Sequence, residues 1–412
     1  MQKAVPDAPR PGRDPGFQEV YQRYEASRRR KAGVLDLSSV PSGPTVTHLD
    51  LDLTLACNLR CTYCFKVKDN EHQDLQIALD SVTWLIYASG DAEEITIALI
   101  GGEPMVRFKE LKQIVPFAKR RAAQHGKRIH FSMTTNGTIV NDEILEFFDR
   151  WGIGFHTSID GHAEVQDTHR RFAGGKGSSD VLHKNLPRIL GVRPDTCARS
   201  TVMPDTAGEM VKSFDYFRSL GYTNMAFVPG APDDWDDDSI ELLRSEFDRL
   251  ADRVIDTFRS GERVVVKYID EMCSARAKGQ TKKPLPCGVG RGMLLADING
   301  DLWPCHRWSK NGSDWKLGSL YDSDANNDER NEKRKVFYER DEPEKCHPCP
   351  ARPICGGGCP AENLEETGDL WDRHENSCRM DALLASTGAR VYETLSGEQN
   401  ETFLQAYPPV QS

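Results

Sequence analysis

The chain has 412 residues, a formal net charge of −10, 38% hydrophobic residues and 28% charged residues, a composition typical of a folded globular protein of two to three domains. The acidic balance and the absence of a run of about 20 apolar residues disfavour a nucleic-acid or membrane partner, and the polar, proline-rich start lacks a secretory signal. We therefore expect a cytoplasmic protein whose 12 cysteines bind metal rather than form disulfides.

Residues 16–32 have the apolar spacing of a helix and belong to a predicted N-terminal extension over 1–47. Strand and helix patterns then alternate. The predicted strands are 48–56, 94–102, 129–137, 152–161, 197–203 and 224–230. The predicted helices are 75–89, 110–124, 142–151, 181–190, 209–220 and 240–260. This alternation predicts an α/β fold with a parallel sheet, closed as a partial (β/α)6 TIM-like barrel over 48–285.

The pattern changes after about residue 262. Residues 293–308 predict a hairpin with an Asn-Gly turn. Residues 325–345 are highly charged and have too few apolar side chains to bury a core. We predict a small cysteine-rich domain over 286–380 that depends on metal for its shape, followed by a C-terminal helix and tail over 381–412.

Three cysteines follow the first predicted strand directly, with the spacing Cys57-x3-Cys61-x2-Cys64. Parallel α/β folds place their sites at this end of the strands. Three thiolates on one short loop can hold three irons of a [4Fe–4S] cluster, and the fourth iron keeps an open position for an external ligand. A zinc site with a distant fourth ligand is the alternative.

The segment CNLRCTYCF resembles the signature loop of the radical S-adenosylmethionine (SAM) enzymes. In that family the open iron binds SAM, and one electron cleaves SAM to a 5′-deoxyadenosyl radical that removes a substrate hydrogen. GGEP at 101–104, TTNG at 134–137 and SIDG at 158–161 continue the resemblance at the ends of later strands. The resemblance implies SAM contacts by Tyr63, Gly101, Gly102, Glu103, Pro104, Thr135, Asn136, Ser158 and Arg170. From the residues alone, TTNG can also be a plain turn, and Arg170 and Arg171 can be a solvated pair.

Seven cysteines between 287 and 378 form a second group, at positions 287, 305, 346, 349, 355, 359 and 378. Their spacing resembles the SPASM extension of radical SAM enzymes, which holds two auxiliary [4Fe–4S] clusters, so three clusters are expected in all. The resemblance implies one cluster on Cys346, Cys349, Cys355 and Cys378, and a second on Cys287, Cys305 and Cys359. Zinc is the alternative metal here too.

The second auxiliary cluster has only three matching cysteines, because Met293 stands where sulfatase-maturing members have another. Thioether-forming peptide maturases resemble this case, in which the remaining iron can bind a substrate thiolate, water or another side chain. Cys273 is the competing fourth ligand; alternatively Cys273 and Cys197 are small buried hydrophobic residues. His306 is the candidate catalytic residue, because it follows Cys305 where the sulfatase maturases have an acid that acts as general base. A packed or solvent-facing histidine is the other reading.

Together these resemblances imply a radical SAM oxidoreductase that modifies a short ribosomally synthesised (RiPP) peptide and forms a thioether or carbon–carbon cross-link. The expected partners are that peptide and a flavodoxin or ferredoxin-type reductant. Because 47 residues are too few for the leader-binding domain of many relatives, three alternatives stay open: a separate leader-binding protein is a partner, the barrel mouth reads the leader, or the substrate is not a leader peptide. The alternatives are oxidation of a small alcohol, an amino sugar or a protein Ser or Cys, peptide epimerisation, and a non-catalytic iron–sulfur electron carrier.

Overall fold

The computed structural model describes Leu35 and residues 43–282, 287–310, 313–322, 325–339 and 342–409. The predicted helix at 16–32 lies outside these ranges. Within them, no helix has the length and apolar character needed to cross a membrane.

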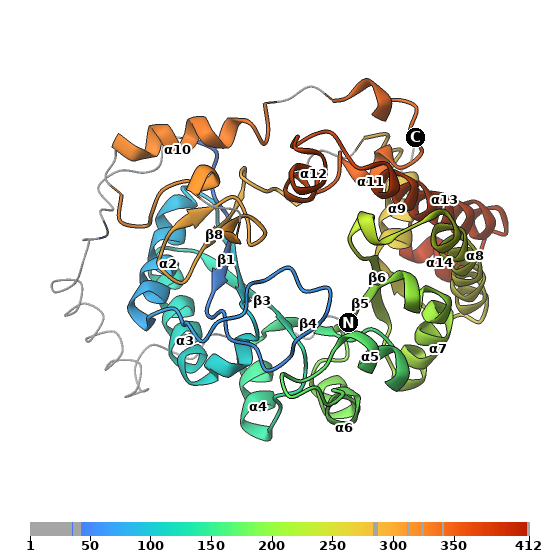
Figure 1. Ribbon diagram of the computed structural model, residues 1–412, viewed down its shortest axis with the longest axis horizontal. Helices are drawn as coiled ribbons and strands as arrows, with labels where there is room; N and C mark the ends of the chain where they lie inside the picture. Colours follow the sequence, from blue (N-terminus) through green and yellow to red (C-terminus); the bar gives the residue numbers. More distant parts are fainter. Residues whose placement is uncertain are drawn as a thin grey trace.

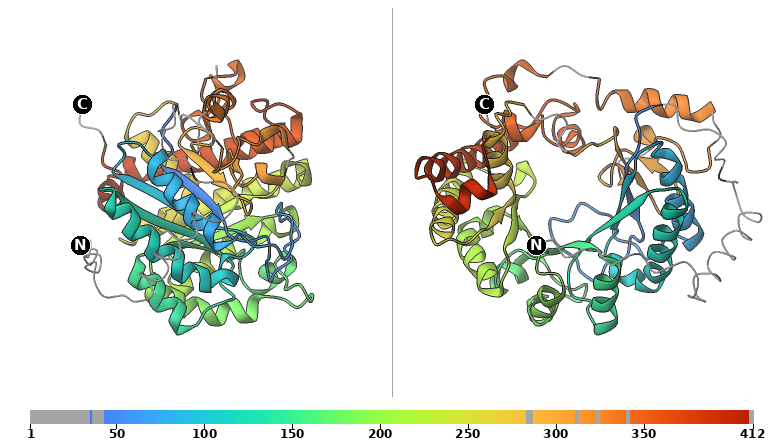
Figure 2. Two further views of the ribbon diagram at one scale, coloured as in Figure 1. Left: turned by 90° about the vertical axis from the view of Figure 1, so that its left-hand side faces the viewer. Right: turned by 180° about the vertical axis from the view of Figure 1, so that it is seen from behind.

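One nine-stranded sheet frames the molecule, in the order β7-β6-β5-β4-β3-β2-β1-β8-β9. Its parallel barrel strands are β1 His48–Asp52, β2 Glu94–Ile100, β3 Arg128–Thr135, β4 Gly154–Ser158, β5 Cys197–Val202, β6 Asn224–Pro229 and β7 Val265–Val266. The strands curve into an incomplete ring with helices on the outside (Figures 1 and 2). We call the side of the sheet away from the helices its inner face. The predicted parallel α/β barrel is confirmed. β7 is an additional strand that was not predicted, because two residues are too few to show an alternating pattern.

The helices of this region are α2 Leu75–Ala88, α3 Phe108–Gln124, α4 Asp142–Trp151, α5 Ala163–His169, α6 Ser179–Val192, α7 Met210–Leu220, α8 Asp237–Arg259 and α9 Lys267–Ala277. Local chemistry explains their ends. Asn141 begins α4 by accepting a hydrogen bond from the amide of Ile144, and Gly152 ends it in the left-handed conformation. Asp236 and Ser239 form a capping box at the start of α8. Six of these helices match the predicted ones; α5 and α9 were not predicted.

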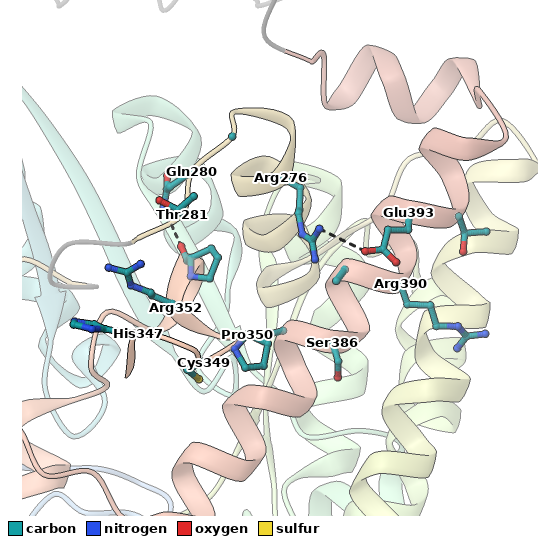
Figure 3. A pocket seen from close by; sticks show the side chains of 15 residues that line it. Arg276, Gln280, Thr281, His347, Cys349, Pro350, Arg352, Ser386, Arg390 and Glu393 are labelled. Carbon is teal, nitrogen blue, oxygen red and sulfur yellow. Dashed lines mark hydrogen bonds and ion pairs between the residues drawn. The ribbon is translucent and has the colours of Figure 1, made fainter. Parts of the chain in front are cut away.

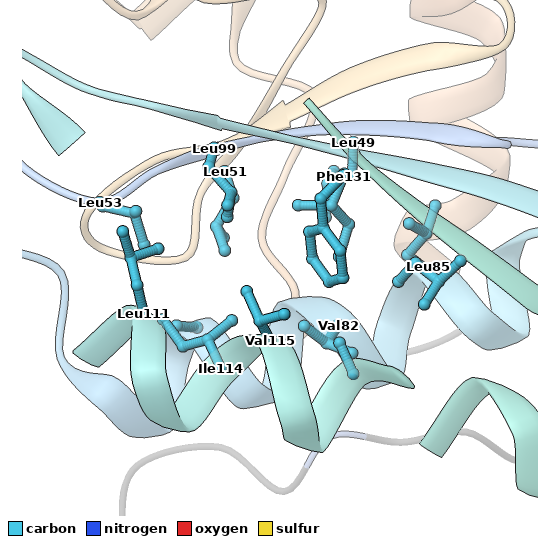
Figure 4. Packing of buried hydrophobic residues seen from close by; sticks show 14 of the residues in the cluster. Leu49, Leu51, Leu53, Val82, Leu85, Leu99, Leu111, Ile114, Val115 and Phe131 are labelled. Atoms are coloured by element: carbon cyan, nitrogen blue, oxygen red, sulfur yellow. The ribbon is translucent and has the colours of Figure 1, made fainter. Parts of the chain in front are cut away.

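The core between the sheet and its helices follows from the alternation of side chains along each strand. In β1, Leu49 and Leu51 are fully buried on the helix side, whereas Asp50 and Asp52 lie on the inner face. The residues that meet across this layer include Leu49, Leu51, Leu99 and Phe131 from the strands and Val82, Leu85, Leu111, Ile114 and Val115 from α2 and α3 (Figure 4). Each such side chain contributes roughly 1.5–3 kcal/mol when fully buried.

The C-terminal region continues the same sheet. The predicted hairpin forms as β8 Met293–Ala296 and β9 Leu302–Trp303, and β8 pairs with β1 in parallel. The remaining helices are α10 Ala325–Lys335, α11 Arg352–Cys355, α12 Pro360–Thr367, α13 Glu375–Gly397 and α14 Glu401–Ala406. Short 3₁₀ turns are η1 Pro104–Arg107, η2 Pro204–Glu209, η3 Pro232–Asp234, η4 Trp308–Lys310, η5 Ser313–Trp315 and η6 Glu344–Cys346. The expected domain boundary between residues 380 and 381 falls inside α13. The same helix therefore carries Cys378 and packs against α8 and α9.

Candidate functional site

The loop after β1 carries three free, partly buried thiols, those of Cys57, Cys61 and Cys64. Backbone hydrogen bonds join this loop to residues 169–173 in antiparallel fashion, from Arg60 N to Arg171 O at 2.7 Å and from Ala173 N to Asn58 O at 3.0 Å. The three thiols lie close enough to influence one another electrostatically. The fold therefore holds the triplet as one group at the carboxyl end of the barrel.

Positive charge lies beside these thiols. Burial raises the pKa of Cys57 and of Cys61, and the charges of Lys68 and Arg170 respectively oppose this rise. The Lys68 ammonium donates a hydrogen bond to Cys64 Sγ at 2.9 Å. Such neighbours favour the thiolate, which is the form that binds metal.

The GGEP segment supports the base of the cysteine loop. Gly102 N donates to Thr54 O at 2.7 Å, and Glu103 N donates to Ala56 O at 2.9 Å. A Cβ at Gly102 would lie 2.4 Å from Ala56 O, so only glycine fits here. We expected these glycines to approach a ligand; the structure shows in addition that they approach the backbone next to Cys57.

Glu103 connects this segment to the end of β3. Its side chain is 1% exposed and accepts hydrogen bonds from Thr135 Oγ1 at 2.8 Å, Asn136 N at 2.8 Å and Met105 N at 3.0 Å. Burial raises the pKa of Glu103, and these hydrogen bonds oppose the rise. The Asn136 amide in turn donates to Asn58 Oδ1 at 2.8 Å. TTNG is thus part of a network that reaches the cysteine loop, and not a plain turn.

A second buried cluster forms around Asp160, in the SIDG segment. Tyr63 OH donates to Asp160 Oδ2 at 2.5 Å, and Arg170 Nε lies 3.0 Å from the same oxygen. The Arg170 guanidinium also lies 5.4 Å from the centroid of the Tyr63 ring. Burial has the largest single effect and would lower the pKa of Arg170, but Asp160, Tyr63 and Cys61 together outweigh it and raise that pKa. Of the two candidate arginines, only Arg170 is buried near the thiols; Arg171 is exposed.

Among the other expected SAM contacts, Ser158 ends β4, and Pro104 is the buried first residue of η1. Asp160 was absent from the expected site residues although it lies inside SIDG. Its position next to Ser158 was the available signal, but its partners Tyr63 and Arg170 are brought to it only by the fold. All these residues surround the cysteine loop, and their contact with SAM stays a prediction.

His306 is held against both β1 and the cysteine loop. Its Nδ1 lies 2.9 Å from Asp50 Oδ2, and its ring stacks on Phe65 with centroids 5.6 Å apart. Burial would raise the pKa of Asp50, but hydrogen bonds from His306 and His48 lower it strongly. His306 is therefore paired with Asp50 and stacked on Phe65 while 39% of its side chain stays exposed, and its catalytic role stays a prediction.

The later cysteines form two groups. Cys305 is buried and within electrostatic reach of Cys359 and Cys287, and Met293 packs against the hydrophobic cluster that contains Cys305 and Cys359. Cys273 lies elsewhere, buried between α9 and α13, where its Sγ donates to Gly388 O at 3.7 Å. Its placement, and that of the buried Cys197 on β5, matches the small-hydrophobe alternative.

The other group lies toward α13. Cys378 is within electrostatic reach of Cys349. Lys345 is close enough to act on both Cys346 and Cys378. Arg373 acts in the same way on Cys355 and Cys378. Cys349 also lines a cavity of about 790 Å³ between α9, α11 and α13, whose rim carries Arg276, Arg352, Arg390 and Glu393 (Figure 3). Shared electrostatic neighbours place Cys346, Cys349, Cys355 and Cys378 in this region, and that they hold one auxiliary cluster, which we call the outer cluster, stays a prediction.

No three His, Cys, Asp or Glu side chains in the described part of the chain are arranged to hold a single metal ion. A [4Fe–4S] cluster has a different requirement, because each thiolate binds its own iron. Three free thiols on one loop, flanked by Lys68 and Arg170, fit that requirement.

Comparisons with known proteins agree with this geometry. The model of the radical SAM superfamily matches residues 51–217. A protein of Clostridium novyi (strain NT) named cysteine-type anaerobic sulfatase-maturating enzyme is 23% identical over 319 residues, which cover 74% of this chain and 84% of that protein. Among solved structures, anSMEcpe with bound AdoMet (SAM) has a TM-score of 0.73 at 17% identity and covers 89% of this chain and 100% of its own. SuiB of Streptococcus suis bound to precursor peptide SuiA has a TM-score of 0.55 at 15% identity, covering 87% of this chain and 80% of its own.

Proposed function

Residues 51–217 form a radical SAM domain, which makes this chain a radical SAM enzyme, and from that premise we propose that its substrate is a ribosomally synthesised peptide. The proposed product is a peptide with a thioether or carbon–carbon cross-link. Epimerisation differs from cross-linking in the mass of the product, whereas dehydrogenation removes the same two hydrogens and is distinguished by the fragments of the modified peptide.

The observation that carries the radical SAM chemistry of the proposal is the set of contacts that hold the cysteine loop in place. Contacts from the ends of β2, β3 and β4 all converge on it: Gly102 binds its base, Asn136 binds Asn58, and Asp160 binds Tyr63. A loop held so firmly, with three thiols and no disulfide among them, is suited to carry a cluster with one open iron.

Cys57, Cys61 and Cys64 would hold the SAM-binding cluster in this proposal. When bound, the cluster and SAM supply the 5′-deoxyadenosyl radical that removes a substrate hydrogen. Glu103 would accept the SAM ammonium through its remaining acceptor capacity, and Arg170 would offer its guanidinium to the SAM carboxylate. Lys68 would compensate the negative charge of the thiolates.

A peptide substrate is supported by the relatives. One solved structure of similar fold holds a precursor peptide, and a relative is named for the maturation of sulfatases. The two later cysteine groups would hold auxiliary clusters, one on Cys287, Cys305 and Cys359 with Met293 nearby. His306, held by Asp50, is the candidate group to hold a proton close to the reacting peptide.

The test compares two cysteine variants of the anaerobically reconstituted enzyme, each incubated with SAM, a reductant and any short peptide found to be encoded beside its gene. Cys57→Ala removes a ligand of the SAM-binding cluster, so we expect no 5′-deoxyadenosine and no modified peptide. Cys349→Ala removes a ligand of the outer group, so we expect 5′-deoxyadenosine to form while modified peptide is lost. Chromatography measures the nucleoside, and mass spectrometry measures the peptide.

The product mass separates the reaction classes. Loss of two hydrogens from the peptide supports cross-linking or dehydrogenation, whereas an unchanged composition with one deuterium taken from heavy water would indicate epimerisation. Failure of the wild-type enzyme to form 5′-deoxyadenosine would favour the electron-carrier alternative and contradict the proposal. Full peptide turnover by Cys349→Ala would contradict the assignment of the outer cluster.

A further inference from the structure

The inner face of β5 carries a positive charge that the proposed chemistry does not use. Ala198 and Val202 pack with the helices, so the alternation of β5 turns Arg199 to the inner face, where it is exposed. The guanidinium of Arg199 makes no hydrogen bond or ion pair with any residue that the structure describes. A cation of this kind on the wall of a barrel is available to a ligand.

Strand register places a second cation in the same row. Arg199 is paired with Ser158 of β4 on one side and with Ala226 of β6 on the other. Val266 of β7 is paired with Met225, so Lys267 follows at the level of Ala226. Ala226, which is 2% exposed, therefore stands between the two cationic residues in this row. Figure 1 shows β5, β6 and α9 together on one side of the ring.

Electrostatic effects on neighbouring groups confirm that these charges converge. Desolvation lowers the pKa of His156, and the charges of Arg199 and Lys267 lower it further. The same two charges oppose the rise that burial causes in the pKa of Cys197. His156 is accessible to solvent, yet the barrel wall around it removes part of its hydration, and this desolvation has the largest effect on its pKa.

No ion pair joins Arg199 to the surrounding acids among the described residues. Asp381 of α13 and Glu271 of α9 lie near Tyr268, but Asp381 is bound by Arg373 at 2.8 Å. On β1, across the ring in Figure 1, Asp50 and Asp52 are bound by His306 and Lys66. On the inner face, the acidic side chains of β1 therefore have basic partners. The guanidinium of Arg199 on β5 forms no ion pair with any described residue.

We propose that Arg199, with Lys267 beside it, forms a carboxylate-binding subsite that receives an Asp or Glu side chain of the substrate peptide. A guanidinium binds a carboxylate with two parallel hydrogen bonds, which fixes both position and orientation. This inference rests on the proposed peptide substrate and makes Arg199 a specificity-determining residue.

The carboxylate of SAM is the other source of the same chemistry. Thr201 N donates to Asp160 Oδ1, which joins the end of β5 to the Tyr63 and Arg170 cluster. Arg199 precedes Thr201 by two residues, which is roughly 7 Å deeper along the strand. That depth favours a substrate group over the methionyl end of SAM, for which Arg170 is already in place.

The experiment measures binding to the reconstituted holoenzyme with SAM, by calorimetry at low salt. The probes are two capped peptides, acetyl-Ala-Glu-Cys-Ala-amide and its Gln counterpart. We expect wild type to bind the Glu peptide about tenfold more tightly, the effect of one charged hydrogen bond. In Arg199→Gln this preference should disappear, whereas Arg244→Gln, on the exposed outer side of α8, should retain it.

Equilibrium dialysis with labelled SAM is run on the same three proteins. Unchanged SAM affinity in Arg199→Gln supports a substrate subsite, and a tenfold loss would assign the guanidinium to SAM and overturn the inference. Equal affinity of wild type for the two peptides, or a preference that survives in Arg199→Gln, would also overturn it. Formation of 5′-deoxyadenosine by wild type reports on the proposed function separately.

Discussion

At the scale of single residues, the site depends on side chains that act on the cysteine loop rather than on a ligand alone. Gly102 allows β2 to end against Ala56, and Glu103 fastens the end of β3 with both carboxylate oxygens. Asp160 holds Tyr63 and Arg170 in the same way. The motif residues are therefore also structural residues of the loop that would carry the cluster.

Gly102→Ala should disrupt this loop, because its new Cβ would meet a backbone oxygen that cannot move aside. We expect a destabilisation of about 1–3 kcal/mol, the usual range for overpacking, together with less iron bound at the first site. Thermal unfolding and iron analysis measure the two effects. Gly191→Ala on α6, where nothing lies within 4 Å of the new methyl group, is the matched control and should behave as wild type. Equal behaviour of the two variants would refute the packing argument.

At the scale of elements, α10 shows how a highly charged segment can dock without an apolar face. Arg334 is 1% exposed and donates to Gly290 O at 2.7 Å and Pro44 O at 2.8 Å. Burial lowers the pKa of Arg334 to about 10. Arg330 donates to Leu317 O at 2.9 Å. We expected metal alone to organise this region; the structure adds buried arginine–carbonyl bonds.

Arg334→Ala would leave the carbonyls of Gly290 and Pro44 buried without their donor. Because each unsatisfied group costs about 1–3 kcal/mol, we expect the unfolding free energy to fall by about 3 kcal/mol. Denaturant unfolding measures it. The control is Lys335→Ala, one residue along, whose exposed ammonium pairs only with Glu332 of the same helix among the contacts described. A loss of stability as large in the control would show that α10 is held by charge in general.

At the scale of the whole molecule, the cysteine-rich region is joined to the barrel at two places. The β8–β9 hairpin extends the sheet beside β1, and α13 packs on α8 and α9 at the opposite end of that sheet. Cys378 lies in the first turn of α13, so the position of this thiol depends on helix packing against the barrel. Figure 2 shows α13 lying along α8 and α9 from behind.

Gly388→Ala tests this coupling. A Cβ at Gly388 would lie 2.6 Å from the Cβ of Met272 on α9, so α13 would be pushed away and Cys378 displaced from Cys349. We expect a lower melting temperature and fewer irons per chain, while Cys57, Cys61 and Cys64 still support SAM cleavage. Gly397→Ala, at the open end of α13, should match wild type. Unchanged iron content in Gly388→Ala would show that iron binding by the outer cysteine group does not depend on the packing of α13, and would contradict this prediction.

The sequence by itself determined the repeating elements and the chemistry they carry. Alternation along strands and helical periodicity are local properties, so strands β1 to β6, the hairpin and the helices α2, α3, α4, α6, α7 and α8 were predictable within a few residues, whereas α9 was missed. The first cysteine group was equally accessible because its three thiols lie on one short loop, whereas the grouping of the later cysteines was implied by the resemblance to the SPASM extension. The short elements β7 and α5 escaped because a few residues hold too little periodicity.

Only the tertiary structure decided which distant residues meet. The pairing of β8 with β1, the choice of Arg170 over Arg171, the contact of His306 with Asp50 and the row formed by Arg199 and Lys267 each join segments far apart in the chain. Their physical cause is the register of the sheet and the packing of helices on it, which a residue's sequence neighbours do not encode. The chemistry was therefore readable from the chain, whereas the surroundings that select a substrate were not.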